Sequence, residues 1–424
     1  MQLSELDYIL FGINALAYIL LFVRFWRIDR RWNLRTFITL LYASSAVFSP
    51  HVYQVIDEHF YQGVQIDHLT FFPFVYLFLM YLLLFSPLLH SNIQDIKQFD
   101  ILNPKLLNIL TWVVVSIYAI TIAFSGIHIT DLFSLEKLMQ NYADTVNNAI
   151  DGFKVDVSLI ERITSIFKGA TTDIVILLLA YHIITNQKTG IIAMALCMGF
   201  DVIYNLSIGQ RAVILEVIFS FAFIFLFTRQ AMDEKIKRRF SIGLITFGAI
   251  AVLAFGALTF ARFSERDNSI ADYVLTYYSE SWYIFNNHGL DPGGCRYGDF
   301  TAPLIRRMMG KECTKTMFES VDKFTSMRTN CSIFNTIVGD FTMDFGVIWT
   351  TIIMLLYAAL MHFALRNEDS DHFPFAKLII VIIAWRIAAI GYISFSYRGI
   401  GGNIQLVADL LFYFLLRYRY VYKR

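Results

Sequence analysis

The sequence has few charged residues and lacks a recognisable cleavable leader. Asp, Glu, Lys and Arg make up 16% of its 424 residues, whereas a soluble domain carries roughly a quarter. The deficit extends along nearly the whole chain, which excludes an ordinary soluble protein. The first apolar run starts at Tyr8 after an acidic segment, and no small-residue cleavage site follows it. We therefore expect this run to be retained as a membrane span.

Long apolar runs take the place of the missing charges. Runs of about 20 residues recur, and each is long enough to cross a bilayer core of about 30 Å. They are continuously apolar and do not alternate between two faces, which excludes a β-barrel. We predict an all-α polytopic helical bundle in which residues 1–424 form a single integral membrane domain with about eleven transmembrane helices. The predicted spans are 7–23, 36–56, 69–89, 106–124, 166–185, 190–208, 211–228, 240–261, 335–363, 376–396 and 403–418.

The distribution of Lys and Arg predicts the orientation of these spans. Basic residues cluster at 24–35, 229–239 and 417–424, which the predicted spans place on one side of the membrane. Positive charge near span ends marks the cytoplasmic side. We therefore expect the N-terminus outside and the C-terminus in the cytoplasm. Two long connections, 125–165 and 262–332, then lie outside.

The first external connection contains a helical pattern. Between Asp131 and Ile150 the apolar residues recur at steps of three and four, which predicts an amphipathic helix. Such a helix either caps the bundle or lies in the membrane interface and guides a lipid substrate. The pattern alone leaves both interpretations open.

The four cysteines carry little chemistry by themselves. Cys197 lies inside a predicted span, where a small packing role is the simplest interpretation. Cys295, Cys313 and Cys331 lie in the second external connection, and Cys295 with Cys313 is the nearer candidate pair for a disulfide. A third thiol would then stay free. No C-x-x-C pair is present, so we predict no metal site.

Four arginines from three separate connections reach the external face in the predicted topology. Arg211 follows Gly209 and Gln210 in a very short connection, Arg262 and Arg266 open the 262–332 connection, and Arg398 precedes a glycine-rich turn. Arg keeps its charge and binds phosphate through two nitrogens. We interpret the four as a diphosphate-binding set. The alternative is that each one anchors its span end to lipid phosphates.

Aromatic and titratable residues gather between 273 and 288. Aromatic faces with polar edges suit sugars, although a membrane-interface belt has the same composition. The candidate sugar-binding residues are Tyr277, Tyr278, Trp282 and Tyr283. Groups that exchange a proton near neutral pH can activate a hydroxyl. The candidate catalytic residues are Glu280, His288 and Asp344, the last in a predicted span.

With these residues the chain resembles the Wzy-type oligosaccharide repeat-unit polymerases of bacterial O-antigen, lipopolysaccharide and capsule biosynthesis. The resemblance rests on Gly209-Gln210-Arg211 before an apolar helix, on a large external loop opened by Arg262 and Arg266, and on Asp344-Phe345-Gly346 at a span entry. These motifs are short, and loop cysteines are not typical of the family.

The resemblance implies a glycosyltransferase of the bacterial inner membrane. Its donor and acceptor would both be undecaprenyl-diphosphate-linked oligosaccharides, and membrane lipid and a chain-length regulator protein would be further partners. It implies no nucleotide sugar, cofactor, metal or nucleic acid. Two other functions fit the same residues: an O-antigen ligase, which would transfer the glycan to lipid A core, and a flippase or transporter of lipid-linked oligosaccharides.

Overall fold

The computed structural model describes most of the chain as helices. The described residues are 4–52, 68–90, 93–124, 159–207, 212–263, 270–314, 317–328, 335–366 and 371–418. The exceptions to helix include one short parallel pair, in which β1 (Phe99–Asp100) lies beside β2 (Phe373–Pro374). The prediction of an all-α fold is confirmed. The predicted helix over Asp131–Ile150 lies outside the described residues.

The chain divides into two compact units, each built from three stretches of sequence. Unit 1 comprises 1–90, 262–363 and 384–403, and unit 2 comprises 91–261, 364–383 and 404–424. Helices α11, α15, α16 and α17 contribute residues to both units.

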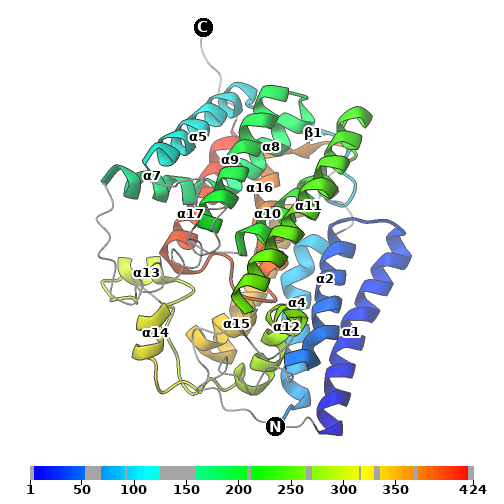
Figure 1. Cartoon of the computed structure of the whole chain (residues 1–424), viewed down its shortest axis with the longest axis vertical. Helices are drawn as coiled ribbons and strands as arrows, with labels where there is room; N and C mark the ends of the chain where they lie inside the picture. Colours follow the sequence, from blue (N-terminus) through cyan, green and yellow to red (C-terminus); the bar gives the residue numbers. More distant parts are fainter. Residues whose placement is uncertain are drawn as a thin grey trace. The chain divides into compact units, whose positions relative to one another are not determined.

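Unit 1 begins with three long helices that pack side by side (Figure 1). These are α1 (Glu5–Asp29), α2 (Leu34–Phe48) and α4 (Phe71–Leu89), with the 3₁₀ turn η1 (Ser49–His51) after α2. Its later helices are α12 (Ile270–His288), α13 (Pro303–Met308), α14 (Met317–Lys323) and α15 (Thr336–Leu365).

The short turn between α1 and α2 follows from its polar residues. Arg30 adopts a left-handed conformation that ends α1, and the Asn33 side chain accepts a hydrogen bond from Thr36 N to begin α2. Such an N-cap contributes about 1 kcal/mol. Arg35 forms an ion pair with Asp29 across the turn, so two adjacent helices are fixed in an antiparallel arrangement.

Unit 2 is built mainly from helices between residues 104 and 263. They are α5 (Pro104–Phe124), α7 (Leu159–Ala170), α8 (Thr172–Ile184), α9 (Lys188–Ser207), α10 (Ala212–Thr228) and α11 (Glu234–Phe263). The 3₁₀ turn η4 (Phe375–Lys377) leads into α16 (Leu378–Ile390), and α17 (Gly399–Arg417) ends the described chain. Inside the unit, Lys168 and Asp201 form an ion pair of 2.8 Å between α7 and α9.

Among the described residues, six helices are long and apolar enough to cross a membrane. They are α1, α4, α5, α9, α15 and α17, and α7 with α8 forms a bent pair that adds a seventh candidate. The remaining predicted spans fall on α2, α10, α11 and α16. Six or seven candidate spans are consistent with a multi-pass membrane protein, whereas eleven stays a prediction.

Exposed apolar side chains on these helices agree with that interpretation. Leu16 on α1 is 53% exposed, and Ile348 and Leu360 on α15 are 75% and 68% exposed. Water would disfavour so much apolar surface, and large exposed apolar areas mark protein or membrane contacts.

Helix α12 is the main departure from the expected polar loop at 262–332. Its Trp282 is fully buried and donates from Nε1 to Ser45 Oγ of α2 at 2.8 Å. Asn286 exchanges two hydrogen bonds with the Thr70 backbone, at 2.9 and 2.8 Å. Polar side chains of α12 thus bind neighbouring residues of unit 1, and residues 270–288 of the predicted loop belong to its helical core.

Candidate functional site

Asp344 lies at the centre of a buried polar cluster in unit 1. Arg296 Nε donates to Asp344 Oδ1 at 2.7 Å, and neither side chain has exposed surface. The other carboxylate oxygen accepts from Thr301 N at 2.6 Å and Thr301 Oγ1 at 2.7 Å. Buried charges are tolerated when they are paired and hydrogen-bonded. The cluster therefore fixes residues 296–301 against α15.

A break in α15 follows immediately after Asp344. Gly346 has φ 77° and ψ 170° inside the helical run, a conformation essentially restricted to glycine. Near this break, Tyr76 Oη of α4 donates to Val347 O at 3.2 Å and lies 2.9 Å from Thr351 Oγ1. The Asp-Phe-Gly sequence thus combines a buried carboxylate with a helix break.

Arg398 lies beside the same cluster. Its guanidinium carbon is 5.2 Å from the centre of the Phe300 ring, and that of Arg296 is 4.6 Å from the same ring. Arg398 is half-buried. Cations over an aromatic face are attracted by its quadrupole. Phe300 therefore positions two guanidinium groups, one fully buried and one that retains exposed surface.

Asp340 joins the cluster one helical turn before Asp344. Its Oδ2 accepts from Phe395 N at 2.7 Å, and both Arg398 and Arg296 attract its carboxylate electrostatically. Two arginines and two carboxylates balance in formal charge. A diphosphate bound here would need further positive charge from other parts of the chain. We refer to Arg296, Phe300, Asp340, Asp344 and Arg398 as the Arg398 cluster.

Hydrogen bonds join the two connections that build the cluster. Asn403 Nδ2 donates to Thr301 O at 2.9 Å and to Tyr397 O at 2.8 Å. Gly399 N donates to Phe300 O at 2.9 Å. Gly399 has φ +72°, which favours glycine. The glycine-rich turn after Arg398 is therefore used to bond two peptide segments to one another.

A polar hollow of about 1000 Å³ lies in the same unit, between the α13 end and α14. Its charged lining residues are Arg307, Lys311 and Lys323 with Glu312, Glu319 and Asp322. Beside it the buried Asp299 lies 3.5 Å from both Arg306 Nε and Lys323 Nζ. Arg306 Nη1 also donates to Arg296 O at 3.0 Å. The hollow is therefore tied to the Arg398 cluster by the 296–306 segment.

The three predicted catalytic residues are all buried. Glu280 and His288 on α12 are each 2% exposed, and Asp344 is 0% exposed. Both carboxylate oxygens of Asp344 already accept hydrogen bonds, one from Arg296 and the other from Thr301. Asp344 therefore orients these two residues. The structure brings Asp344 and Arg398 into one cluster. The catalytic roles of the three stay predictions.

The predicted sugar-binding aromatics lie mainly in the packing of α12. Trp282 and Tyr283 have no exposed surface, so their rings offer no face to a sugar in this conformation. Tyr277 and Tyr278 are half-buried. Tyr278 Oη donates to Leu41 O at 2.9 Å, and burial raises the pKa of Tyr278 to about 12. Tyr277 and Tyr278 are therefore the members of this set with accessible surface.

Several predicted residues cannot be placed. Arg211 and Arg266 lie outside the described residues, and so does the side chain of Arg262 at the end of α11. Cys331 lies outside them as well, whereas Cys295 and Cys313 are free thiols, so the Cys295–Cys313 disulfide does not form. Arg296 was not a predicted site residue, because nothing in its local sequence signals a partner 48 positions away.

Comparison with protein-family models, with curated proteins and with solved structures gave no match.

Proposed function

We propose that this protein is a membrane glycosyltransferase that polymerises undecaprenyl-diphosphate-linked oligosaccharide repeat units. We propose the external face of the bacterial inner membrane as its place of action, with eleven spans, an outside N-terminus and a cytoplasmic C-terminus. One observation carries the proposal. Arg398, from the connection between α16 and α17, meets Phe300 of the 262–332 segment and Asp340 at the start of α15.

The proposed reaction moves a glycan between two lipid carriers. The bond between the sugar anomeric carbon and the diphosphate oxygen breaks, and the bonding electrons leave with undecaprenyl diphosphate. A new bond forms from that carbon to a hydroxyl at the non-reducing end of another lipid-linked repeat unit. The hydroxyl proton passes to a base. Negative charge develops on the leaving diphosphate, and its stabilisation is the kind of electrostatic contribution that usually dominates catalysis.

Arg398 is the described group best suited to that stabilisation. It is charged at every physiological pH, it keeps exposed surface, and the Phe300 ring fixes its position. Because Asp340 and Asp344 balance Arg398 and Arg296, we propose that Arg211, Arg262 and Arg266 supply the additional charge. Arg296 and Asp344 act as positioning residues, since both are fully buried.

The polar hollow beside α14 is the proposed contact for the glycan. Carboxylates and cations offer acceptors and donors to sugar hydroxyls, and the described lining carries three groups of each kind. In this proposal Tyr277 and Tyr278 contribute aromatic faces, and Trp282 and Tyr283 have a packing role. Glu280 and His288 remain candidate bases, which requires α12 to expose them during the reaction.

The proposal is tested in the native host with a deletion of the gene and complementation by variants. Wild-type protein should restore a ladder of long glycan chains, and Arg398→Ala should leave single repeat units on lipid A or its equivalent acceptor. Arg398→Lys should restore the ladder poorly, since it retains charge and loses bidentate geometry. The control is Arg328→Ala. Arg328 is 55% exposed, and its ion pair of 2.6 Å is with Asp291, which is not a residue of the Arg398 cluster.

The same experiment separates the alternatives. A ligase deletion would leave long chains that are unattached to lipid A. A transporter deletion would trap lipid-linked repeat units on the cytoplasmic side. Either result, or full activity of Arg398→Ala at wild-type abundance, would overturn the polymerase proposal.

A further inference from the structure

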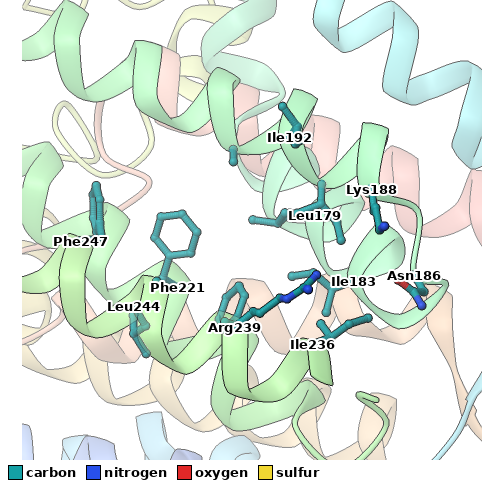
Figure 2. A pocket seen from close by; sticks show the side chains of 14 residues that line it. Leu179, Ile183, Asn186, Lys188, Ile192, Phe221, Ile236, Arg239, Leu244 and Phe247 are labelled. Atoms are coloured by element: carbon teal, nitrogen blue, oxygen red, sulfur yellow. The ribbon is translucent and has the colours of Figure 1, made fainter. Parts of the chain in front are cut away.

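A second cavity lies wholly within unit 2 and has a different chemistry. It has a volume of about 420 Å³ and is lined by residues of α8, α9, α10 and α11 and of the α8–α9 turn. Its apolar wall includes Ile192, Phe221, Leu244 and Phe247, whose side chains face the same space in Figure 2. The ligand that fits this wall is a hydrocarbon chain.

Aromatic contacts hold the wall in place. The Phe221 ring of α10 lies 5.3 Å from Phe247 and 6.1 Å from Phe240, both on α11. Opposite them, Ile192 of α9 is 60% exposed. The groove is thus lined by packed rings on one side and remains open along α9.

Two cations stand at the polar end of the cavity. Lys188 is the first residue of α9, and Arg239 lies one turn into α11, just before its apolar part. Asn186 of the preceding turn lies beside Lys188 (Figure 2). Among the described residues, neither Lys188 nor Arg239 has a carboxylate partner, and both are exposed. Their charge is available to an anion that carries an apolar tail.

We propose that this cavity is a binding site for an anionic glycerophospholipid of the bilayer. The phosphate lies between Lys188 and Arg239, and one acyl chain follows the wall formed by Ile192, Phe221, Leu244 and Phe247. The depth fits this ligand, because α9 is a candidate span from Lys188 onwards and span ends lie at the level of lipid phosphates. Basic pockets between membrane helices recognise anionic head groups in this way.

The lipid connects α9 and α11 across a gap that protein atoms leave open. In the topology proposed above both cations lie at the cytoplasmic leaflet, where anionic lipids are attractive to basic residues. The site itself follows from the cavity and the two charges, and it does not depend on the proposed enzyme activity.

Two glycines of α11 provide a matched test of the apolar part. A Cβ added at Gly243 or at Gly248 meets nothing within 4 Å, so a side chain can leave the backbone at either position without an immediate clash. Gly243 lines the cavity and Gly248 does not. Gly243→Leu should therefore fill the acyl-chain path, and Gly248→Leu should leave it open.

The experiment is native mass spectrometry of the detergent-solubilised full-length protein with phosphatidylglycerol or phosphatidylcholine. Wild-type protein should retain phosphatidylglycerol in preference to phosphatidylcholine, and Gly243→Leu should weaken that retention about tenfold while Gly248→Leu does not. Lys188→Ala with Arg239→Ala should abolish the preference. The charge control is Lys235→Ala with Arg238→Ala, exposed cations of α11 that do not line the cavity.

The outcomes separate the possible ligands. Equal retention of both lipids by wild-type protein would overturn the proposal. Unchanged retention by Gly243→Leu would also overturn it. Displacement of the lipid by millimolar inorganic phosphate would overturn it too, because it would show a phosphate site without an acyl-chain path. If Gly243→Leu does not fold, as judged by size-exclusion chromatography, the charge variants and their control decide.

Discussion

Arg296 and Asp344 form an ion pair of 2.7 Å in which neither side chain has exposed surface. The two residues lie 48 positions apart, one in the segment before α13 and the other in α15. The pair joins the middle of the 262–332 segment to a candidate membrane span. It also places the Phe300 ring beneath Arg398.

Removal of one partner of this pair should destabilise the protein strongly. Asp344→Ala leaves a buried guanidinium unpaired, which costs about 3–5 kcal/mol. The expected result is a lower melting temperature in detergent and reduced abundance in the membrane. Thermal unfolding followed by tryptophan fluorescence measures it.

The double variant Arg296→Met with Asp344→Leu is the control for this prediction. Removing both charges leaves no unpaired buried guanidinium, so much of the lost stability should return. Synthesis of long glycan chains should not return with the stability, because the Arg296–Asp344 pair that positions Phe300 beside Arg398 is then absent. A double variant as unstable as the single one would contradict the buried-pair account.

Gly346 should resist substitution by any residue with a side chain. Its φ of 77° with ψ of 170° costs a non-glycine residue about 1–3 kcal/mol. Gly346→Ala should therefore lower the melting temperature. Gly12→Ala is the matched control, since Gly12 lies in regular helix α1 and an added Cβ meets nothing within 4 Å. Equal effects of the two substitutions would count against the helix break.

The proposed orientation predicts which surface positions are reached from outside. Lys311 and Lys235 are both exposed, and the topology places the first outside and the second in the cytoplasm. In a background without the four native cysteines, Lys311→Cys should react with a membrane-impermeant maleimide in intact spheroplasts. Lys235→Cys should react only after lysis. The reverse pattern would invert the topology.

Stability should fall in mild acid through His90. Its Nε2 lies 2.9 Å from Nδ1 of His362, and burial, followed by the charge of His362, lowers the pKa of His90 below its ordinary 6.5. His90 is therefore protonated less readily in the folded protein than in the unfolded chain. The contribution of neutral His90 to folding stability is fully present above its ordinary pKa. It is lost as the pH falls through the lowered pKa of the folded protein.

His90→Gln should remove that part of the pH dependence. We expect the melting temperature of the wild-type protein to decrease between about pH 7 and about pH 5, and that of His90→Gln to decrease less. Parallel curves for the two proteins would show that His90 does not contribute.

The sequence predicts the helices well because run length and hydropathy report directly on them. Each of the eleven predicted ranges overlaps a described helix. Helix α12 was missed as a buried element because it belongs to 262–332, the one long polar segment of the sequence. Polar side chains of α12 instead donate to neighbouring residues: Ser281 donates to Tyr392 O and Trp282 to Ser45 Oγ.

The candidate site could be predicted only in part, because its residues meet through long-range packing. Arg398 and Asp344 were recognised from a glycine-rich turn and an Asp-Phe-Gly sequence, both local signals. Arg296 and Phe300 join them from the segment before α13, and no spacing in the sequence announces those contacts.

Elongation of the native substrate by purified protein tests the central claim most directly. Lipid-linked repeat units extracted from the deletion strain would be added to proteoliposomes that contain wild-type protein, Arg398→Ala or Arg328→Ala. The account predicts longer glycans on the lipid carrier and release of undecaprenyl diphosphate with the wild-type and Arg328→Ala proteins, and neither product with Arg398→Ala. Absence of elongation by wild-type protein, or equal elongation by Arg398→Ala, would contradict it.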